Sequence, residues 1–286
     1  MTIRNPVEWS ADQVKLAIHA VRSANHELLH VEQGANVARP LVRRITVADL
    51  KDVVAKGFAD FAAYRTDVLF ICLIYPLAGL LLARFALGQG MLPLLFPLVS
   101  GFALIGPFAA AGLYEMSRRR EQGAAVTWFD AFGVFQSPAL GRILELGLLL
   151  TAIFVVWLVV AMAIYVATFG LTMPTSYATF AQEVFTTRAG WTLILVGVGA
   201  GFLFALLVLA ISAISFPLLI DRPVGVSTAI RTSIRAFVVN PVPMLAWGLI
   251  VAGSLVLGAI PALVGLIVVM PVLGHATWHL YRRLVF

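Results

Sequence analysis

Long apolar segments alternate with short polar stretches along most of this chain. The six segments cover residues 68–87, 91–116, 146–168, 191–219, 244–260 and 262–281. Most are close to the roughly 20 residues that an α-helix needs to cross the hydrocarbon core of a bilayer. The pattern therefore predicts an all-α, polytopic membrane protein with six transmembrane helices.

The basic residues are divided unequally between the two sides that such spans create. Of the 20 Lys and Arg residues, 18 lie in the N-terminal segment, in the loops at 117–142 and 220–241, and at the C-terminal end. Only Arg84 and Arg188 lie in the alternate loops. Because cytoplasmic loops carry an excess of Lys and Arg, we expect a multi-pass protein of the bacterial inner membrane with both termini in the cytoplasm.

The first part of the chain has a different pattern, with apolar residues at helical spacing among many polar ones. Thr46, with Asp49 three residues further on, is a capping-box pattern that marks the start of a helix. We therefore predict two regions: a cytoplasmic amphipathic helical segment over residues 1–66 and a six-helix transmembrane domain over residues 67–286.

The centre of the chain contains an internal repeat, over about residues 91–168 and 191–260. Each copy has an apolar span, an Arg-x-x-Gly turn, a short amphipathic stretch, a proline and a second span. The amphipathic stretches at 127–137 and 227–239 are therefore expected to be equivalent cytoplasmic interfacial linker helices. Glycine allows sharp reversals and proline bends helices. The residues expected at turns and kinks are Pro76, Pro107, Gly123, Pro138, Pro217, Gly225, Pro241 and Pro271.

One short motif suggests metal chemistry. His26, Glu27 and His30 match H-E-x-x-H, in which two histidines one helical turn apart bind zinc and the glutamate acts as general base. A catalytic zinc needs a third protein ligand, and the next histidine is His275. We therefore reject this motif as a zinc site and expect no metal and no catalytic residues.

A second pair of histidines lies near the C-terminal end. His275 and His279 are four residues apart and share a helix face. Imidazoles at this spacing can bind a metal, a haem iron or a quinone oxygen, so these are the candidate cofactor-binding residues. Aromatic and basic neighbours suit the headgroup region instead. We expect no cofactor here, and expect both histidines to bond to the aspartates of the 46–64 helix or to lipid headgroups.

Composition and charge narrow the class of function. The chain is 61% hydrophobic and 12% charged. Ion-coupled transporters usually carry ionisable groups inside their spans, and none lies near the middle of a predicted span. No basic run is interleaved with aromatic residues as nucleic-acid binding requires. We expect a non-enzymatic accessory, scaffold or assembly component that contacts membrane lipids and packs against itself or a larger membrane complex.

Two alternatives remain open at this point. The kinked, repeated helices also suit a transporter or a lipid-handling protein. The pair His275 and His279 also suits an accessory subunit of a respiratory oxidase, with haem or quinone nearby.

Several short stretches resemble one bacterial family of integral membrane proteins. They are residues 43–50 (RRITVADL), 74–76 (IYP), 106–107 (GP), 114–117 (YEMS) and 274–279 (GHATWH). Over about residues 40–286 the chain is similar to the domain of unknown function 2189, some of whose members are labelled cytochrome c oxidase subunits. The resemblance implies six spans and no established activity. With five histidines, three of them before the membrane domain, the chain cannot be a catalytic oxidase subunit.

Overall fold

The structure is a computed structural model. It describes residues 40–63, 80–81, 84, 92–102, 106–124, 126–171, 174, 176–261 and 263–286. Pro40–Phe286 form one compact unit, separate from Met1–Arg39. Every regular element in the described residues is a helix, and a single isolated bridge pairs Val42 with Val285. The predicted all-α class is confirmed for this part of the chain.

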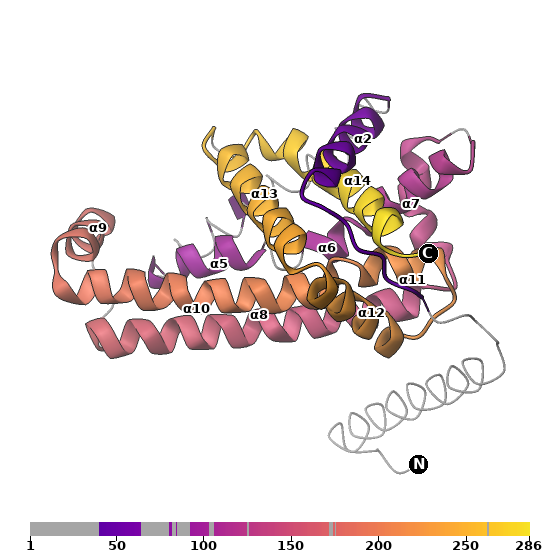
Figure 1. Cartoon of the computed structure of the whole chain (residues 1–286). Coiled ribbons are helices and arrows are strands. Elements are labelled where there is room, and N and C mark those ends of the chain that lie inside the picture. Colours follow the sequence, from indigo (N-terminus) through magenta and orange to yellow (C-terminus); the bar gives the residue numbers. More distant parts are fainter. Residues whose placement is uncertain are drawn as a thin grey trace, which may run out of the picture. The chain divides into compact units, whose positions relative to one another are not determined.

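Three described helices are long and apolar enough to cross a membrane. They are α8 (Leu140–Phe169), α10 (Arg188–Ser212) continued by α11 (Ser215–Asp221), and α13 (Pro241–Ala259). In Figure 1, α8 and α10 lie side by side, with the short α9 (Tyr177–Thr186) beyond one end of the pair. The predicted span at 68–87 lies almost wholly outside the described residues, as does Pro76.

The predicted span at 91–116 is divided into short helices. These are η1 (Leu92–Leu94), α5 (Leu95–Phe102), α6 (Gly106–Ala109) and α7 (Ala111–Glu121). A proline lies in each of the first three, at Pro93, Pro97 and Pro107. Because proline cannot donate a backbone hydrogen bond and clashes with the preceding turn, this segment does not form one continuous helix.

The two linkers occupy the same place in the chain but have different helical forms. The first, η3 (Trp128–Gln136), is a 3-10 helix that Thr127 and Asp130 close with a capping box. The second, α12 (Val226–Val239), is an α-helix. Gly123 has a φ of +75°, a conformation that favours glycine. Gly225 has a φ of −76°, so the second turn does not depend on a glycine.

The prolines expected at kinks have two roles. Pro138 and Pro241 precede or begin α8 and α13, positions where a missing N–H costs nothing. Pro217 lies in the first turn of α11, after the break at 213–214 that separates it from α10. Pro271 lies inside α14 (Leu266–Leu284), which remains one helix.

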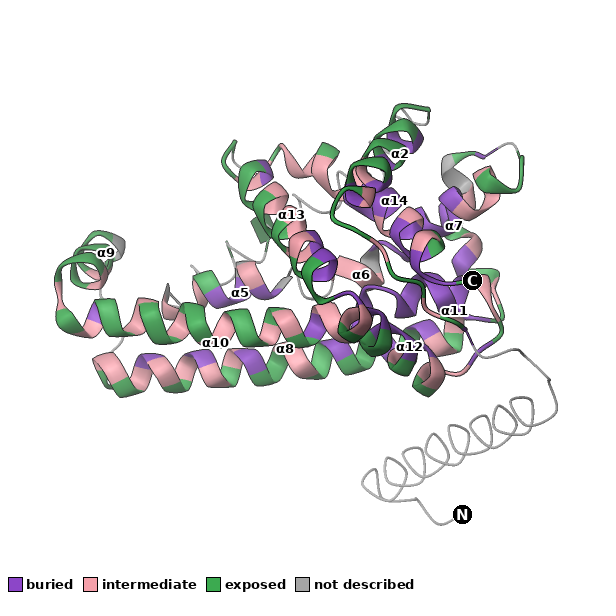
Figure 2. Ribbon diagram, viewed as in Figure 1, coloured by how far each residue is buried: buried purple, intermediate pink, exposed green. Residues whose placement is uncertain are grey.

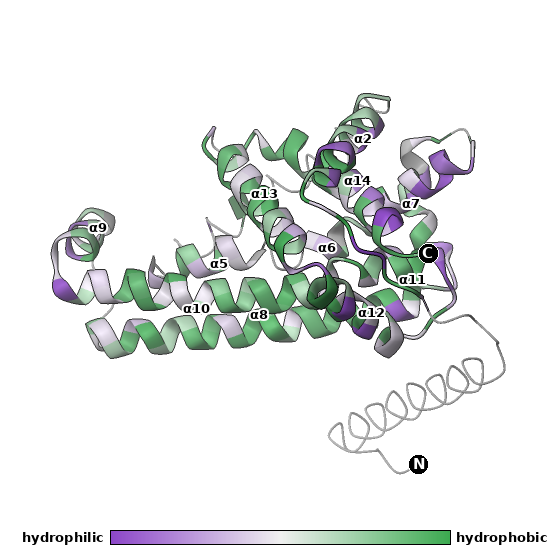
Figure 3. Cartoon of the chain, viewed as in Figure 1, coloured by the Kyte–Doolittle hydropathy of each residue, from purple (hydrophilic) through white to green (hydrophobic). Residues whose placement is uncertain are grey.

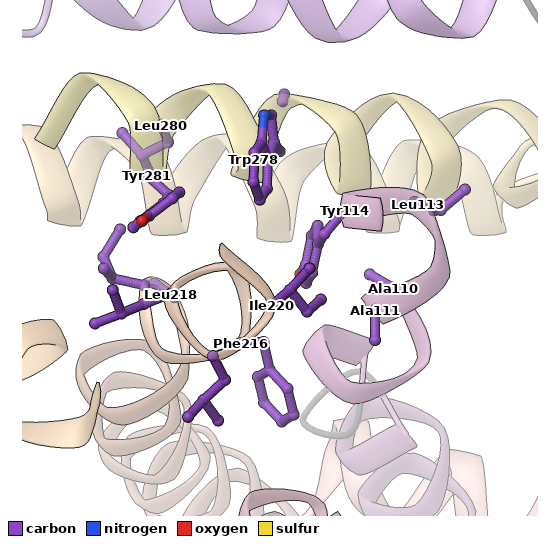
Figure 4. Packing of buried hydrophobic residues seen from close by; sticks show 14 of the residues in the cluster. Ala110, Ala111, Leu113, Tyr114, Phe216, Leu218, Ile220, Trp278, Leu280 and Tyr281 are labelled. Atoms are coloured by element: carbon purple, nitrogen blue, oxygen red, sulfur yellow. The ribbon is translucent and has the colours of Figure 1, made fainter. Parts of the chain in front are cut away.

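The core of the described unit forms where α14 meets α2 (Asp49–Ala63), α7 and α11. Trp278 and Tyr281 extend from α14 toward α11 and toward Tyr114 of α7 (Figure 4), and all three are buried. Helices α2 and α14 approach closely at Gly57, where an added Cβ would lie 2.6 Å from the Cβ of Ala276. The helix at 49–63 thus belongs to the same compact unit as α14.

The spans have a different surface from this core. In Figure 2 much of the length of α8, α10 and α13 is exposed, and in Figure 3 the same surface is largely hydrophobic. In the most apolar stretch of α10 and α11, only 6% of residues are buried. An exposed apolar face of this length matches the hydrocarbon interior of a bilayer.

Candidate functional site

The carboxylate of Asp60, on α2, is the centre of a buried polar cluster. Its Oδ2 lies 2.6 Å from the hydroxyl of Ser117 on α7 and 2.9 Å from Nε2 of His279 on α14. Its Oδ1 accepts a hydrogen bond of 2.7 Å from Nη1 of Arg120. Asp60 is only 5% exposed. One carboxylate therefore joins three of the helices that form the core, α2, α7 and α14.

The hydrogen bonds fix the proton positions in this cluster. An ionised carboxylate only accepts, so Ser117 donates its single hydrogen to Asp60. The Ser117 oxygen then accepts from Nδ1 of His275, 2.8 Å away. His275 is therefore the Nδ1–H tautomer, and its Nε2 carries a lone pair without a hydrogen-bond partner among the described residues. The ring is fully buried, which favours this neutral form.

Further charged side chains lie next to the cluster. Nδ1 of His279 lies 3.9 Å from Oε1 of Glu121, whose Oε2 is 3.0 Å from Nε of Arg282. Arg120 bonds both the Asp60 carboxylate and the backbone carbonyl of Ala59. Both carboxylates, Asp60 and Glu121, therefore have an arginine partner.

Further ion pairs hold the same helices together. Arg283 of α14 contacts Asp49 at the start of α2. The hydroxyl of Tyr281 donates to Asp221 at the end of α11, with an oxygen–oxygen distance of 2.5 Å. Glu115 and Arg118 of α7 are paired at 2.8 Å. Arg119 bonds Glu115 at 2.7 Å and also pairs with Asp130 of η3. Each of these four carboxylates is thus bonded to or paired with a side chain of this chain.

The local environment lowers the pKa of both α2 carboxylates. Burial raises the pKa of Asp60, but hydrogen bonds from His279 and Ser117 outweigh it, and the net shift is downward. The pKa of Asp49 falls well below its usual range because Arg283 donates to it and the Thr46 backbone and hydroxyl add further hydrogen bonds. Both groups are therefore ionised at neutral pH, as ion pairing requires.

The structure places the predicted histidines as expected in one respect. His279 bonds Asp60 of the helix at 46–64, as expected, whereas His275 bonds Ser117 of α7, which in turn bonds Asp60. The H-E-x-x-H motif at His26, Glu27 and His30 lies outside the described residues. Within the part of the chain that is described, no group of three or more His, Cys, Asp or Glu side chains is placed to hold a metal ion.

A haem or quinone does not fit between the two histidines. His279 Nε2 is already bonded to Asp60. His275 donates from Nδ1 to Ser117, and it sits beside Gly274, where an added Cβ would already come within 2.5 Å of Leu113. A haem pocket needs an open iron position and room for a macrocycle. With His279 Nε2 bonded to Asp60 and the close packing beside His275, the site has no room for a macrocycle, so we derive no redox chemistry from these residues.

Sequence reasoning did not find Ser117 or Arg120. A lone serine and one arginine in a run of three carry no pattern that sets them apart. The only available signal is their spacing, since residues 117 and 120 are three apart and share a helix face. Their partner, Asp60, is 57 residues from Ser117, and such a pairing depends on the tertiary fold.

Comparison with known proteins supports the membrane assignment. Residues 95–221 match the model of a family described as predicted integral membrane protein (DUF2189). Over this region, which is less than half of the chain, the protein is similar to that family. The matched region includes α7, with Ser117 and Arg120, whereas Asp60, His275 and His279 lie outside it. That description mentions no oxidase. No curated protein and no solved structure matches the chain.

Proposed function

We propose that this protein is a non-enzymatic accessory or scaffold component of a membrane complex. In this proposal the long apolar helices, α8, α10 and α13 among them, cross the bacterial inner membrane, and both termini lie in the cytoplasm. The cytoplasmic side carries a small folded cap made of α2, α7, α11 and the second half of α14.

The observation that supports this proposal most strongly is the saturation of the Asp60 carboxylate. Three donors from two other helices occupy its two oxygens. A catalytic carboxylate must instead be able to exchange a proton with a substrate. With both oxygens engaged and the residue buried, Asp60 is suited to holding α2 against α7 and α14.

The exposed helix faces supply the second argument. Leu195 and Leu203 of α10 are 69% and 64% exposed, and Leu148 and Val159 of α8 are 70% and 64% exposed. Such faces suit lipid or the helices of another membrane protein. Among helices in a membrane, association relies on close packing and small residues. An added Cβ at Gly197 on α10 would meet nothing within 4 Å, which leaves room for a partner helix.

The positions of the charges support the orientation. Arg188 begins α10, while Asp221 and Arg222 follow its far end. The ion-paired cap is joined to that far end, where α11 meets α14 through Asp221 and Tyr281. An ionised cluster of this size is stable only outside the hydrocarbon. The cap therefore lies on the same side as the 18 basic residues.

The two alternatives receive less support. A haem or quinone between the two histidines would need Nε2 of His279, which is bonded to Asp60, and space beside His275, where Gly274 packs closely on Leu113. The transporter reading relies on broken helices around a central site. The breaks within the described residues fall between α6 and α7 and between α10 and α11, and Glu115, next to the first, is paired within the chain.

Site-specific photo-crosslinking tests the proposal. A photoreactive amino acid is placed at Leu195 or Leu203 on α10, and at exposed Phe58 on α2 as a control outside the membrane. We expect a discrete protein adduct from α10 in intact cells, with the same partner recovered in a reciprocal experiment from that partner's helix. Adducts with lipid alone at every α10 position would contradict the scaffold role.

A further inference from the structure

We propose that the outer face of α12 binds anionic phospholipid headgroups through Arg231 and Arg235. This inference requires that α13 is inserted in the membrane, and it does not depend on the accessory role. It assigns a lipid class and a binding surface to a helix that the sequence shows only as an amphipathic linker.

The two faces of α12 differ in chemistry. The inner face is made of small residues, with Ala229, Thr232, Ser233 and Ala236 buried. The outer face carries Arg231 and Arg235, both exposed, next to Ile234 and Val238, which are 41% and 68% exposed. These four recur at spacings of three and four residues, so they line one stripe. Arginines interleaved with aliphatic side chains are typical of helices that lie at the headgroup boundary.

The part of the chain that contains α12 carries a net positive charge, and no acidic residue within it balances that charge. From Arg222 to the C-terminal Phe286 the chain has no Asp or Glu. Asp221, the nearest acidic residue, is already bonded to Tyr281 and lies within 4 Å of Arg222 and Arg282. A phosphate group is the complementary partner for guanidinium groups, which can bind it through two parallel hydrogen bonds.

The connection to α13 places this stripe at headgroup depth. Helix α12 ends at Val239, and the candidate span α13 begins at Pro241. The buried residue between them, Asn240, fixes the junction: its Oδ1 accepts from the Ile45 N–H at 2.8 Å and its Nδ2 donates to the Arg43 carbonyl at 3.0 Å. The arginines of α12 are thus held next to the end of a membrane helix, where phosphates lie.

The other linker lacks this chemistry and gives a contrast. In η3, Asp130 pairs with Arg119. Its exposed residues include Phe132 and Phe135, whose rings stack with centroids 6.1 Å apart. An aromatic pair inserts among lipids without selecting their charge. Preference for anionic lipid therefore belongs to α12.

Native mass spectrometry of the full-length, delipidated protein tests this. Phosphatidylglycerol or phosphatidylcholine is added, and the dissociation constant of the first bound lipid is measured. We expect phosphatidylglycerol to bind more tightly, and Arg231→Gln with Arg235→Gln to weaken it by about fivefold for each arginine, the factor expected for one basic residue near an anionic surface. Raised salt should reduce the preference in the original protein.

Two control variants have matched designs. Lys51→Gln with Lys56→Gln removes the same charge from the exposed face of α2, and we expect it to leave the lipid preference unchanged. Arg231→Lys with Arg235→Lys keeps the charge and should keep most of the preference. An excess of glycerol 3-phosphate should compete weakly, since it has the phosphate without the acyl chains that Ile234 and Val238 contact.

Four results would overturn the proposal. The first is equal affinity for the two lipids in the original protein. The second is an unchanged preference in the glutamine variant of α12. The third is an equal loss in the α2 control, which would mean that net charge, and not this surface, sets the preference. The fourth is a preference that free glycerol 3-phosphate abolishes. That result would mean that the ligand is a soluble phosphate and not the bilayer surface.

Discussion

At the scale of single residues, Asp60 explains why α2 stays in place. Three donors from α7 and α14 converge on a carboxylate that is 5% exposed. The cost of a buried polar network appears when one member is removed, because the others are left without partners. Ser117, His279 and Arg120 would each lose a bond if this carboxylate were absent.

We therefore expect Asp60→Ala to lower the free energy of unfolding by about 2–3 kcal/mol, the range for hydrogen bonds to charged groups. Arg120 is 36% exposed at its side chain, so water compensates part of its loss and values near the lower end are expected. Denaturant unfolding in detergent measures this. Asp52→Ala is the matched control, because that side chain is 70% exposed. Equal effects of the two substitutions would show that the Asp60 cluster contributes no more to the free energy of unfolding than an exposed carboxylate does.

The pH dependence of stability has a definite sign. The pKa of Asp60 and that of Asp49 both lie below the usual 3.8 in the folded protein. Their stabilising effect is thus complete above the unfolded pKa and is lost as the pH falls through the folded pKa. We expect little contribution from these groups to changes between pH 7 and pH 5, and a decline below about pH 4. Thermal unfolding across this range measures it. Asp60→Asn together with Asp49→Asn should flatten that decline, and an unchanged decline would exclude these carboxylates as its cause.

At the scale of elements, the packing of α2 on α14 depends on a close backbone approach. An added Cβ at Gly57 would lie 2.7 Å from both the Ala276 nitrogen and the Val272 carbonyl oxygen. Backbone atoms cannot rotate away as a flexible side chain can. The two helices would have to separate, and the bonds from His279 and Arg283 to α2 would lengthen with them.

We therefore predict that Gly57→Ala destabilises the protein by about 1–3 kcal/mol through overpacking, although alanine has the higher helix propensity by up to about 1 kcal/mol. Gly197→Ala on α10 is the matched control, because nothing lies within 4 Å of the added Cβ. The same unfolding measurement should show that control to be neutral or slightly stabilising. A stabilising Gly57→Ala would mean that the α2–α14 contact is looser than described.

The helices also show which features of the fold can be predicted from the sequence and which cannot. The uninterrupted apolar segments at 146–168, 191–219 and 244–260 correctly predicted the positions of α8, of α10 with α11, and of α13. The segment at 91–116 is equally apolar, but it contains prolines, which lack the backbone N–H that a continuous helix needs. Hydropathy measures only how apolar a segment is, so it did not predict this division. The bond of His279 to an aspartate of α2 was predicted from the sequence. Ser117 and Arg120 were not, because their roles depend on which helices meet, and the packing of Gly57 on Ala276 fixes that only in three dimensions.

At the scale of the whole molecule, two kinds of surface are separated. The long apolar faces belong to α8, α10 and α13, and the ion-paired cap belongs to α2, α7 and α14. Positive charge follows the same division, since Arg188 is on the side opposite the cap and most basic residues are on the cap side. This separation is what a membrane protein with a cytoplasmic cap requires, and it connects the fold to the proposed scaffold role.

The most direct test of this account is the labelling of single cysteines in intact and permeabilised cells. Cys72 is the only cysteine, so Cys72→Ser gives a clean background. Exposed positions on both sides are then replaced one at a time: Ala178→Cys on α9, Lys56→Cys on α2 and Ser227→Cys on α12. We predict that a maleimide unable to cross the inner membrane labels position 178 in intact cells, and labels positions 56 and 227 only after permeabilisation. Labelling of position 56 or 227 in intact cells, or protection of position 178 there, would contradict the orientation of the cap and with it the proposed function.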